Sequence, residues 1–422
     1  MSKLSRFTRS RNLLIGAGFA ALLGALALGQ AALDKSSVAQ AATSEMAPRF
    51  EVDPLWPKPL PNHWVLGMTI GVWVDTDDHV WIIHRSSATL ANNEKPLENG
   101  QGECCAGAPP VLEFDQAGNL LRHWGGPGEG YEWPDSNHGI SIDYKGNVWI
   151  GGNGGPDSEL LKFTKDGKFL LQVGKKGARR KAGAAAGAGE GQVAGFEGGS
   201  NDTENFGRVA KIWVDRQANE AYVADGYLNK RVAVLDADTG KMKRWWGAYG
   251  NKPDDTPMPP YDPTKPPAQQ FRNPVHCANM SNDRQVYVCD RQGDRLQVFA
   301  PDGTFIREEF YDKNTKNAGS VWDISFSNDP GQQYIFMADG VNEKVRIINR
   351  RSLKTLTMFG DGGRQPGQFY GVHSIATDSK GNIYTTETYE GKRVQRFINK
   401  GMAPVYVRNQ GTLALWPGFN KR

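Results

Sequence analysis

The chain has little net charge of either sign and few long apolar runs. Lys and Arg number 50 and Asp and Glu 46. Five of the bases and one of the acids lie in the first 41 residues, which leaves 45 of each in the remainder. This balance gives no support for a nucleic-acid partner, and we expect none. Beyond the first 30 residues no stretch is apolar enough to span a membrane, and none has a helical period.

The one apolar run lies near the N-terminus. Four basic residues precede apolar residues 13–28, and Ala39 and Ala41 form a small-residue cleavage site. This pattern predicts a secretory signal peptide over residues 1–41, with an uncleaved anchor as the alternative. We therefore expect an exported protein, periplasmic or extracellular, with no membrane attachment after cleavage.

An internal repeat runs through the rest of the chain. Each copy alternates apolar and polar residues, turns at Asp, Asn or Gly, and then repeats the alternation, which is typical of short antiparallel strands. The six copies are residues 71–125, 138–174, 210–247, 276–310, 322–360 and 373–401. Four strands in about 40–50 residues are typical of one propeller blade. We predict an all-β, six-bladed β-propeller with NHL-like repeats over residues 69–422, preceded by an N-terminal extension, 42–68.

Three insertions interrupt this regular pattern. Residues 86–110 lie inside the first repeat, a Gly-, Ala- and Lys-rich segment covers 175–205, and a proline-rich connector covers 250–270. Such compositions are typical of surface loops. Because loops on one face of a propeller surround the mouth of its channel, we hypothesise that these insertions form a lid.

The four cysteines fall in two pairs. Cys277 and Cys289 lie symmetrically about a turn, so they face each other across a hairpin, as a disulfide or as two packed thiols. Cys104 and Cys105 are adjacent. A vicinal disulfide, a soft-metal site and a plain loop are all compatible with that spacing.

Three of the seven histidines occupy one position of the repeat: His138 in "NHGISID", His276 in "VHCANMS" and His373 in "VHSIATD". The same position holds Ile70, Ala210 and Trp322 in the other repeats, so histidine alternates around the ring. Alternate blades lie about 120° apart, and inner strands line the channel. Three imidazoles with an open fourth position are what a catalytic zinc ion uses. The alternative is three separate core histidines.

Three polar residues follow second strands, close to where the histidines begin the first strands. They are Arg85, Tyr227 and Arg291. Arginine binds a carboxylate through two parallel hydrogen bonds, and a tyrosine beside zinc and arginine can act as a general base at lowered pKa. The alternatives are a salt bridge, for example to Asp290, and blade packing for the tyrosine.

The other histidines have less informative positions. His63, His79 and His123 lie in a pre-blade segment, a turn and an outer strand, where surface or structural roles are expected. His84 ends a second strand, and we place it near the channel mouth without assigning it a role.

These motifs resemble the peptidyl-α-hydroxyglycine α-amidating lyase domain, a six-bladed propeller related to NHL-repeat proteins, over nearly all of the mature chain. The resemblance implies that His138, His276 and His373 bind catalytic zinc. It implies a catalytic tyrosine at Tyr227, in "ADGYLNKR". Arg85, in "IHRS", and Arg291, in "CDRQGDRL", match the family's arginines. The implied reaction cleaves the C–N bond of a carbinolamide to an amide and glyoxylate, with zinc as Lewis acid.

The chain also departs from that family. The resemblance implies a structural calcium ion with backbone ligands at Val72 and Ile140, but Ser374 stands where the family has an acidic ligand. The family's disulfides are not reproduced, because Leu228 follows Tyr227 and Cys289 is displaced. No copper monooxygenase domain is present in this chain to make the hydroxyglycine.

Three functions follow as hypotheses. The first is a zinc lyase of the amidating type, and the second a zinc propeller hydrolase such as a lactonase. The third is a non-enzymatic NHL-type binding propeller. For an enzyme we expect a monomer acting on a small carboxylate-bearing or peptide-like substrate.

Overall fold

The computed structural model describes residues 24–26, 30, 45–182 and 195–413. Apart from residues 24–26 and 30, the predicted signal peptide lies outside these residues. The chain divides into two compact units. One comprises Met1–Ala47 and Met402–Tyr406, within which the Val405 amide donates to the Glu45 carbonyl. The other, Pro48–Gly401 and Val407–Arg422, contains the β-propeller. Within the described ranges, no helix has the length and hydropathy of a membrane span.

Six four-stranded antiparallel sheets make up the propeller. The first contains β3 (Thr69–Val74), β4 (Val80–His84), β6 (Val111–Phe114) and β7 (Leu120–Trp124). The second contains β8 (Asn137–Ile142), β9 (Val148–Gly152), β10 (Glu159–Phe163) and β11 (Phe169–Gly174). The third contains β12 (Val209–Asp215), β13 (Glu220–Asp225), β14 (Arg231–Asp236) and β15 (Met242–Trp246).

The remaining three sheets follow the same order. The fourth contains β16 (Val275–Met280), β17 (Val286–Asp290), β18 (Arg295–Phe299) and β19 (Phe305–Phe310). The fifth contains β20 (Asp323–Phe326), β21 (Tyr334–Asp339), β22 (Lys344–Asn349) and β23 (Thr355–Phe359). The sixth contains β24 (Val372–Thr377), β25 (Ile383–Glu387), β26 (Arg393–Pro404) and β1 (Met46–Asp53). The predicted fold class, an all-β six-bladed propeller, is confirmed.

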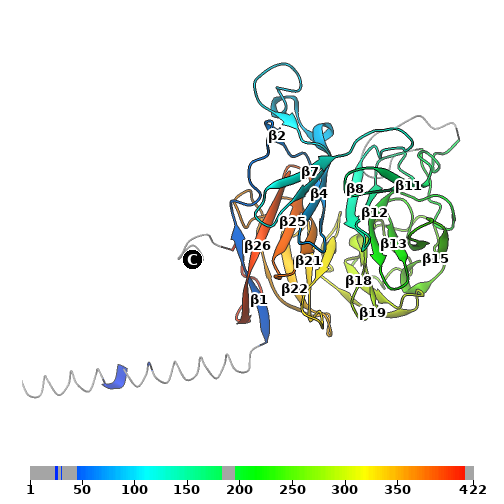
Figure 1. Ribbon diagram of the computed structural model, residues 1–422. Helices are drawn as coiled ribbons and strands as arrows, with labels where there is room; N and C mark the ends of the chain where they lie inside the picture. Colours follow the sequence, from blue (N-terminus) through cyan, green and yellow to red (C-terminus); the bar gives the residue numbers. More distant parts are fainter. Residues whose placement is uncertain (1–23, 27–29, 31–44, 183–194, 414–422) are drawn as a thin grey trace, which may run out of the picture. The chain divides into compact units, whose positions relative to one another are not determined.

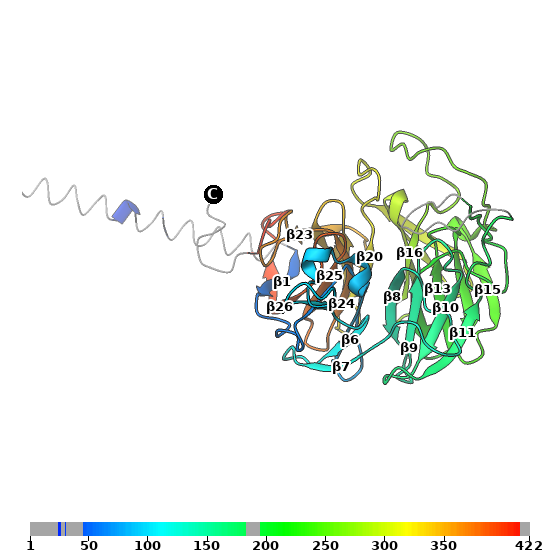
Figure 2. The same ribbon diagram turned by 90° about the horizontal axis from the view of Figure 1, so that it is seen from above.

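The first strand of every sheet lies on the inside of the ring. These strands contact one another in cyclic order, β3 to β8, β12, β16, β20, β24 and back to β3. In Figure 2, β8, β16, β20 and β24 lie toward the middle, with β1, β26, β11 and β15 at the periphery. The residues at the starts of these inner strands therefore meet around one channel.

The ring is closed by a strand from outside the predicted blades. β1 pairs with β26 as the outer strand of the sixth sheet, and Figure 1 shows the two side by side. Asp53 receives an ion pair from Arg396, and Phe50 packs on Phe336 and Phe359. The range expected to be an N-terminal extension thus contributes one blade strand, which the boundary at residue 69 left out.

The apolar core lies between neighbouring sheets. Trp81 and Ile83 of the first sheet pack against Ile150 and Leu161 of the second. Equivalent clusters join the second sheet to the third, the third to the fourth, the fourth to the fifth, and the first to the sixth. The inner strands of each sheet are covered on both faces by the neighbouring sheets. Strands such as β4 are therefore buried along their whole length.

The smaller elements belong to the connections. β2 (Trp64–Val65) and β5 (Ala106–Gly107) form a short parallel pair. The described residues also contain four 3₁₀ turns outside the sheets: η1 (Ser86–Thr89), η2 (Asn92–Glu94), η3 (Ala248–Gly250) and η4 (Arg291–Gly293). The last of these carries a predicted site residue, Arg291, at its first position.

Candidate metal centre and cavity

Three histidines meet at the channel. His138, His276 and His373 come from β8, β16 and β24, and each is at most 4% exposed. Their ring centroids are 4.8–5.1 Å apart. One nitrogen from each ring lies within 4.8 Å of the others. The symmetry expected from the repeat therefore brings the three imidazoles together at one point.

Bulges in the inner strands aim these side chains. The β16–β17 ladder pairs Val275 with Asp290 and then Cys277 with Cys289, so His276 is left out. The ladders of β24 and β8 shift register in the same way, at His373 and His138. A bulged residue is freed from the regular alternation, and its side chain can turn toward a site.

Backbone carbonyls of the intervening blades form hydrogen bonds with the Nδ1 atom of each histidine ring. Nδ1 of His138 bonds the Ala210 carbonyl at 2.7 Å, and Nδ1 of His373 bonds the Ile70 carbonyl at 2.6 Å. Nδ1 of His276 bonds the Trp322 carbonyl. A carbonyl only accepts, so each Nδ1 carries the proton and each Nε2 presents a lone pair to the centre.

The same three residues, Ile70, Ala210 and Trp322, are those that replace histidine in the other repeats. Ile70 and Ala210 also lie at register shifts of their strands, which frees their carbonyls from the ladder. The Ala210 carbonyl also approaches the β8 backbone so closely that only glycine fits at residue 139, since a Cβ on Gly139 would lie 2.3 Å from the Ala210 oxygen. Histidine and carbonyl therefore alternate around all six blades.

The donor set fits a metal ion. Burial, above all, holds the pKa of each of the three histidines well below its usual range, so the rings are neutral. The Tyr227 hydroxyl lies 2.9 Å from His138 Nε2 and 3.0 Å from His276 Nε2. The Tyr227 hydroxyl carries one proton, so it can donate to only one of these two Nε2 lone pairs. Neutral imidazoles with converging Nε2 atoms are ligands for a borderline transition metal.

Tyr227 lies two residues beyond β13 and contacts three other site residues. The Arg291 guanidinium donates to its hydroxyl at 3.1 Å, and the tyrosine ring packs edge-on against His138. Burial raises the pKa of Tyr227, whereas Arg291 and Arg85 act to lower it. The lowered pKa expected from the sequence is therefore not what the protein groups alone produce.

The two predicted arginines are held in different ways. Arg291 lies over the ring of Trp322, with its guanidinium carbon 4.5 Å from the ring centroid. Its Nε has no hydrogen-bond partner within the described chain. Asp290 pairs with Arg295 at 2.7 Å, so the salt bridge considered for Arg291 is not its role. Arg85 donates to Asn153 Oδ1 at 2.8 Å, and burial lowers its pKa to about 10.

A cavity of about 1040 Å³ opens onto the histidine cluster. Arg85, Tyr227, Arg291 and His373 line its floor, and residues 195–198 and 257–261 line its wall. Two of the three insertions therefore border the cavity, whereas 86–110 does not. Its volume is ample for a peptide-sized substrate.

Tyr389 also lines this cavity and is not among the site residues predicted from the sequence. It lies two residues beyond β25, as Tyr227 lies two residues beyond β13. The sequence signal that could have found Tyr389 is this equivalent position after the second strand of its repeat.

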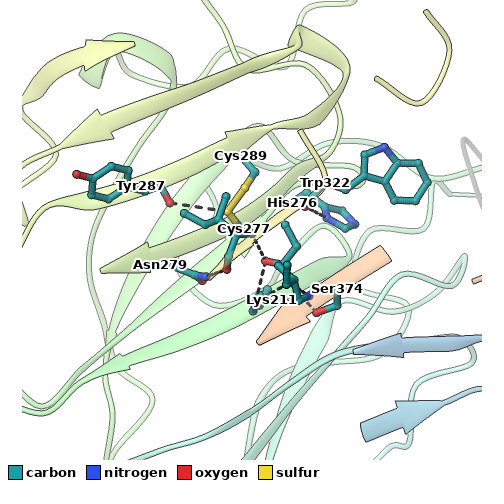
Figure 3. Close-up of a disulfide and its surroundings, with 11 residues drawn as sticks. Lys211, His276, Cys277, Asn279, Tyr287, Cys289, Trp322 and Ser374 are labelled. Atoms are coloured by element: carbon teal, nitrogen blue, oxygen red, sulfur yellow. Dashed lines mark hydrogen bonds and ion pairs between the residues drawn. A yellow bond between two sulfur atoms is a disulfide. The ribbon is translucent and has the colours of Figure 1, made fainter. Parts of the chain in front are cut away.

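A disulfide fastens the strand of one metal-site histidine to the strand that precedes an arginine. Cys277 and Cys289 are bonded across β16 and β17, as Figure 3 shows, with His276 next to Cys277 in the chain. Asp290 and Arg291 follow Cys289. The disulfide alternative for this pair is thus confirmed, and Cys104 is bonded to Cys105 as well.

Replacing Cys277 and Cys289 by alanine is expected to lower the free energy of unfolding by about 3 kcal/mol. The disulfide closes a loop between residues 12 apart. A loop of this size lowers the conformational entropy of the unfolded chain enough to stabilise the fold by about 3 kcal/mol. Replacing the adjacent Cys104 and Cys105 by serine is the matched control, expected to cost under about 0.5 kcal/mol. Urea unfolding measures both. Equal losses in the two double variants would contradict the loop-closure account.

His84, to which the sequence assigned no role, has the contacts of a structural residue. It is fully buried; its Nδ1 accepts from the amides of Gly67 and Ser86, and its Nε2 donates to the Pro109 carbonyl. Burial lowers its pKa to about 4. Of the other histidines, His79 bonds Glu113, and His63 and His123 are exposed, as expected.

Acid is expected to destabilise the fold through His84. Its pKa is lower in the folded chain than in the unfolded chain, so between pH 6.5 and 4 the unfolded state binds the extra proton. The contribution of His84 to the free energy of unfolding is fully present above pH 6.5. It falls by about 2 kcal/mol between pH 7.5 and 5. In His84→Asn, which keeps an acceptor but cannot titrate, urea unfolding should lose this part of the pH dependence. His63→Asn should retain it.

A second cluster of metal-ligand types is already neutralised. Asp75, His79 and Glu113 lie close together, but Lys165 contacts Asp75 at 2.8 Å and Arg122 contacts Glu113 at 2.6 Å. The Lys165 ammonium and the Arg122 guanidinium supply the positive charge that a metal ion would otherwise bring. The histidine triad is thus the better metal candidate in the described chain.

The fold and the site together define a six-bladed β-propeller with an axial three-histidine centre. Its homologues include peptidyl-glycine α-amidating monooxygenases and NHL repeat-containing proteins. The mouse monooxygenase is 27% identical over 60% of this chain and 22% of its own length, and Xenopus laevis monooxygenase A is 28% identical over 40% and 15%. Mouse NHL repeat-containing protein 3 is 25% identical over 74% of this chain and 70% of its own length.

The chain thus spans about a fifth of the length of the mouse amidating relative. No family model matches the chain. Among solved structures, a Bacteroides thetaiotaomicron protein of unknown function has a TM-score of 0.48 at 13% identity, covering 84% of this chain and 77% of that chain. Virginiamycin B lyase from Staphylococcus aureus has a TM-score of 0.42 at 14% identity, covering 87% and 94%. At these values neither informs on activity.

Proposed function

We propose that this chain is a zinc-dependent lyase that cleaves the C–N bond of an α-hydroxyglycine-type carbinolamide to an amide and glyoxylate. One observation carries the proposal: three Nε2 atoms converge beside the Tyr227 hydroxyl, with Arg291 bonded to that hydroxyl. The homologous amidating monooxygenases support the choice of substrate class. We expect an exported monomer acting on small carboxylate-bearing or peptide-like molecules.

The residues divide the work as follows. His138, His276 and His373 would hold zinc through Nε2, and the bound ion would supply Lewis acidity toward the substrate hydroxyl. Arg85 and Arg291 bind the carboxylate, with the planar fork that suits it. Tyr227 takes the hydroxyl proton as the C–N bond breaks, and that proton is then returned to the departing amide nitrogen. The hydroxyl carbon becomes the aldehyde of glyoxylate, so no oxidant or water is consumed.

The arginines also favour the basic form of Tyr227. Arg291 donates to the hydroxyl oxygen, and a donor at that position stabilises the phenolate more than the phenol. The cation–π contact with Trp322 helps to hold the Arg291 guanidinium in place. Both contacts place positive charge where the proton is to be accepted.

The test is the release of glyoxylate from an N-acyl-α-hydroxyglycine. Purified protein loaded with zinc should yield glyoxylate and the N-acyl amide in equal amounts. Treatment with a chelator should abolish the activity and added zinc restore it. No glyoxylate from the loaded protein would overturn the proposal. Hydrolysis of a lactone by the same preparation would favour the hydrolase alternative, and absence of bound metal the binding propeller.

A further inference from the structure

A buried ion pair crosses the channel beside the histidines. Lys211, in β12, places its ammonium 2.7 Å from both carboxylate oxygens of Asp323, the first residue of β20. Lys211 is 5% exposed and Asp323 2%. The two residues come from the third and fifth sheets, neither of which carries a site histidine.

Asp323 accepts further hydrogen bonds from a histidine blade. Its Oδ2 receives the Ser374 hydroxyl at 2.6 Å and the Ile375 amide at 3.2 Å, and its Oδ1 receives the Ile324 amide. Ser374 Oγ in turn accepts from the Val72 amide at 3.4 Å. Through one carboxylate, the inner strands β12, β20, β24 and β3 are joined. Figure 3 draws Lys211 and Ser374 among the surroundings of the Cys277–Cys289 disulfide.

Each member of this network directly follows a residue that shapes the metal centre. Lys211 follows Ala210, whose carbonyl holds His138. Asp323 follows Trp322, whose carbonyl holds His276. Ser374 follows His373 itself. A shift of any of the three side chains therefore moves a ligand or the carbonyl that orients a ligand.

We infer that Lys211, Asp323 and Ser374 form a positioning network for the histidine centre, in which the Lys211 ammonium serves as the built-in cation of the channel. A buried carboxylate must be compensated, by a metal ion or by a charged side chain with hydrogen bonds. In this network the Lys211 ammonium and three further donors form hydrogen bonds with the two oxygens of the Asp323 carboxylate. The inference rests on the three-histidine metal site and not on the lyase reaction.

This network leaves no place for the calcium ion that the family resemblance implies near Val72 and Ile140. Ser374 replaces the acidic ligand, and the nearest carboxylate in its hydrogen-bond network already holds a lysine. Hard cations such as Ca²⁺ need several oxygen ligands, including carboxylates. The donor set around Ser374 therefore fits an ammonium and not a divalent ion.

Lys211→Met tests the inference, because it removes the charge and keeps much of the volume. We expect Co²⁺, used as a spectroscopic probe of the histidine centre, to bind at least 10-fold more weakly, with an altered absorption spectrum. We also expect millimolar Ca²⁺ to raise the Tm of Lys211→Met and to leave that of the wild type unchanged. Wild-type Co²⁺ affinity and spectrum in this variant would overturn the positioning role. A Ca²⁺-dependent Tm in the wild type would overturn the built-in cation.

Two further variants keep the test decisive. Lys162→Met is the matched control: Lys162 is a similarly buried lysine that bonds the Ala237 carbonyl in another part of the fold. It should lower the Tm but leave Co²⁺ affinity within 2-fold. If Lys211→Met does not fold, Lys211→Met/Asp323→Asn removes both charges. That double variant should still bind Co²⁺ more weakly and show no response to Ca²⁺; wild-type Co²⁺ affinity in it would count against the inference. Absence of lyase activity would leave these metal readouts intact.

Discussion

A chain in which His373 is replaced by alanine is expected to lose its bound metal and, with it, its activity. His373 is one of the three candidate ligands, and its Nδ1 is already bonded to the Ile70 carbonyl. Two imidazoles and a water-sized gap do not satisfy a tetrahedral ion. Since even residues that only orient metal ligands are worth 10- to 100-fold in affinity, we expect zinc to bind at least about 100-fold more weakly.

Metal analysis and competition with a chromogenic chelator measure this effect directly. His63→Ala is the control, because His63 is exposed and lies outside the site. It should retain one metal per chain at wild-type affinity. Circular dichroism checks that both variants fold. Stoichiometric zinc at wild-type affinity in His373→Ala would mean that the three rings are core residues, the alternative considered from the sequence.

Replacing Tyr227 by phenylalanine is expected to separate proton transfer from metal binding. The ring and its contacts with His138 and Arg291 remain, but the hydroxyl that faces two Nε2 atoms is removed. General-base groups contribute typically about 10²- to 10⁴-fold to rate, so we expect kcat on an α-hydroxyglycine substrate to fall within that range. KM and zinc content should change little, because Arg85, Arg291 and the histidines are intact.

Tyr144→Phe provides the matched control for the same chemical change. Tyr144 is exposed and bonds Asn219 at the surface, so its variant should keep wild-type kcat. Unchanged kcat in Tyr227→Phe would remove the tyrosine from the mechanism. A parallel fall in zinc affinity would instead assign the hydroxyl to the metal centre.

The sequence allowed the fold and the three-histidine cluster to be predicted because both depend on the repeat. Alternation and turn residues recur in every blade, and a residue at a fixed position in the inner strand must face the channel. His138, His276 and His373 could therefore be placed from their spacing alone. The hairpin disulfide followed for the same reason, since residues equidistant from a turn pair across it.

What could not be predicted depends on side chains from non-neighbouring blades and on local backbone irregularity. The register shifts at Ile70 and Ala210 free the carbonyls that hold the histidines, and no residue type marks them. The pairing of Lys211 with Asp323 joins positions 112 apart. The role of His84 could not be assigned because a strand-end histidine looks the same whether its nitrogens meet solvent or, as here, buried amides.

The strand β1 has a consequence for how the molecule forms. The sixth sheet needs residues from both extremes of the described propeller, and the Arg396–Asp53 pair spans 343 positions. Five sheets can assemble as they emerge, each from its own stretch of chain, but the last cannot be completed until β26 has been made and has found β1. Contacts so distant in sequence are slow to form. Until they do, the outer edge of β26 exposes unpaired backbone groups, the kind of edge to which other chains add.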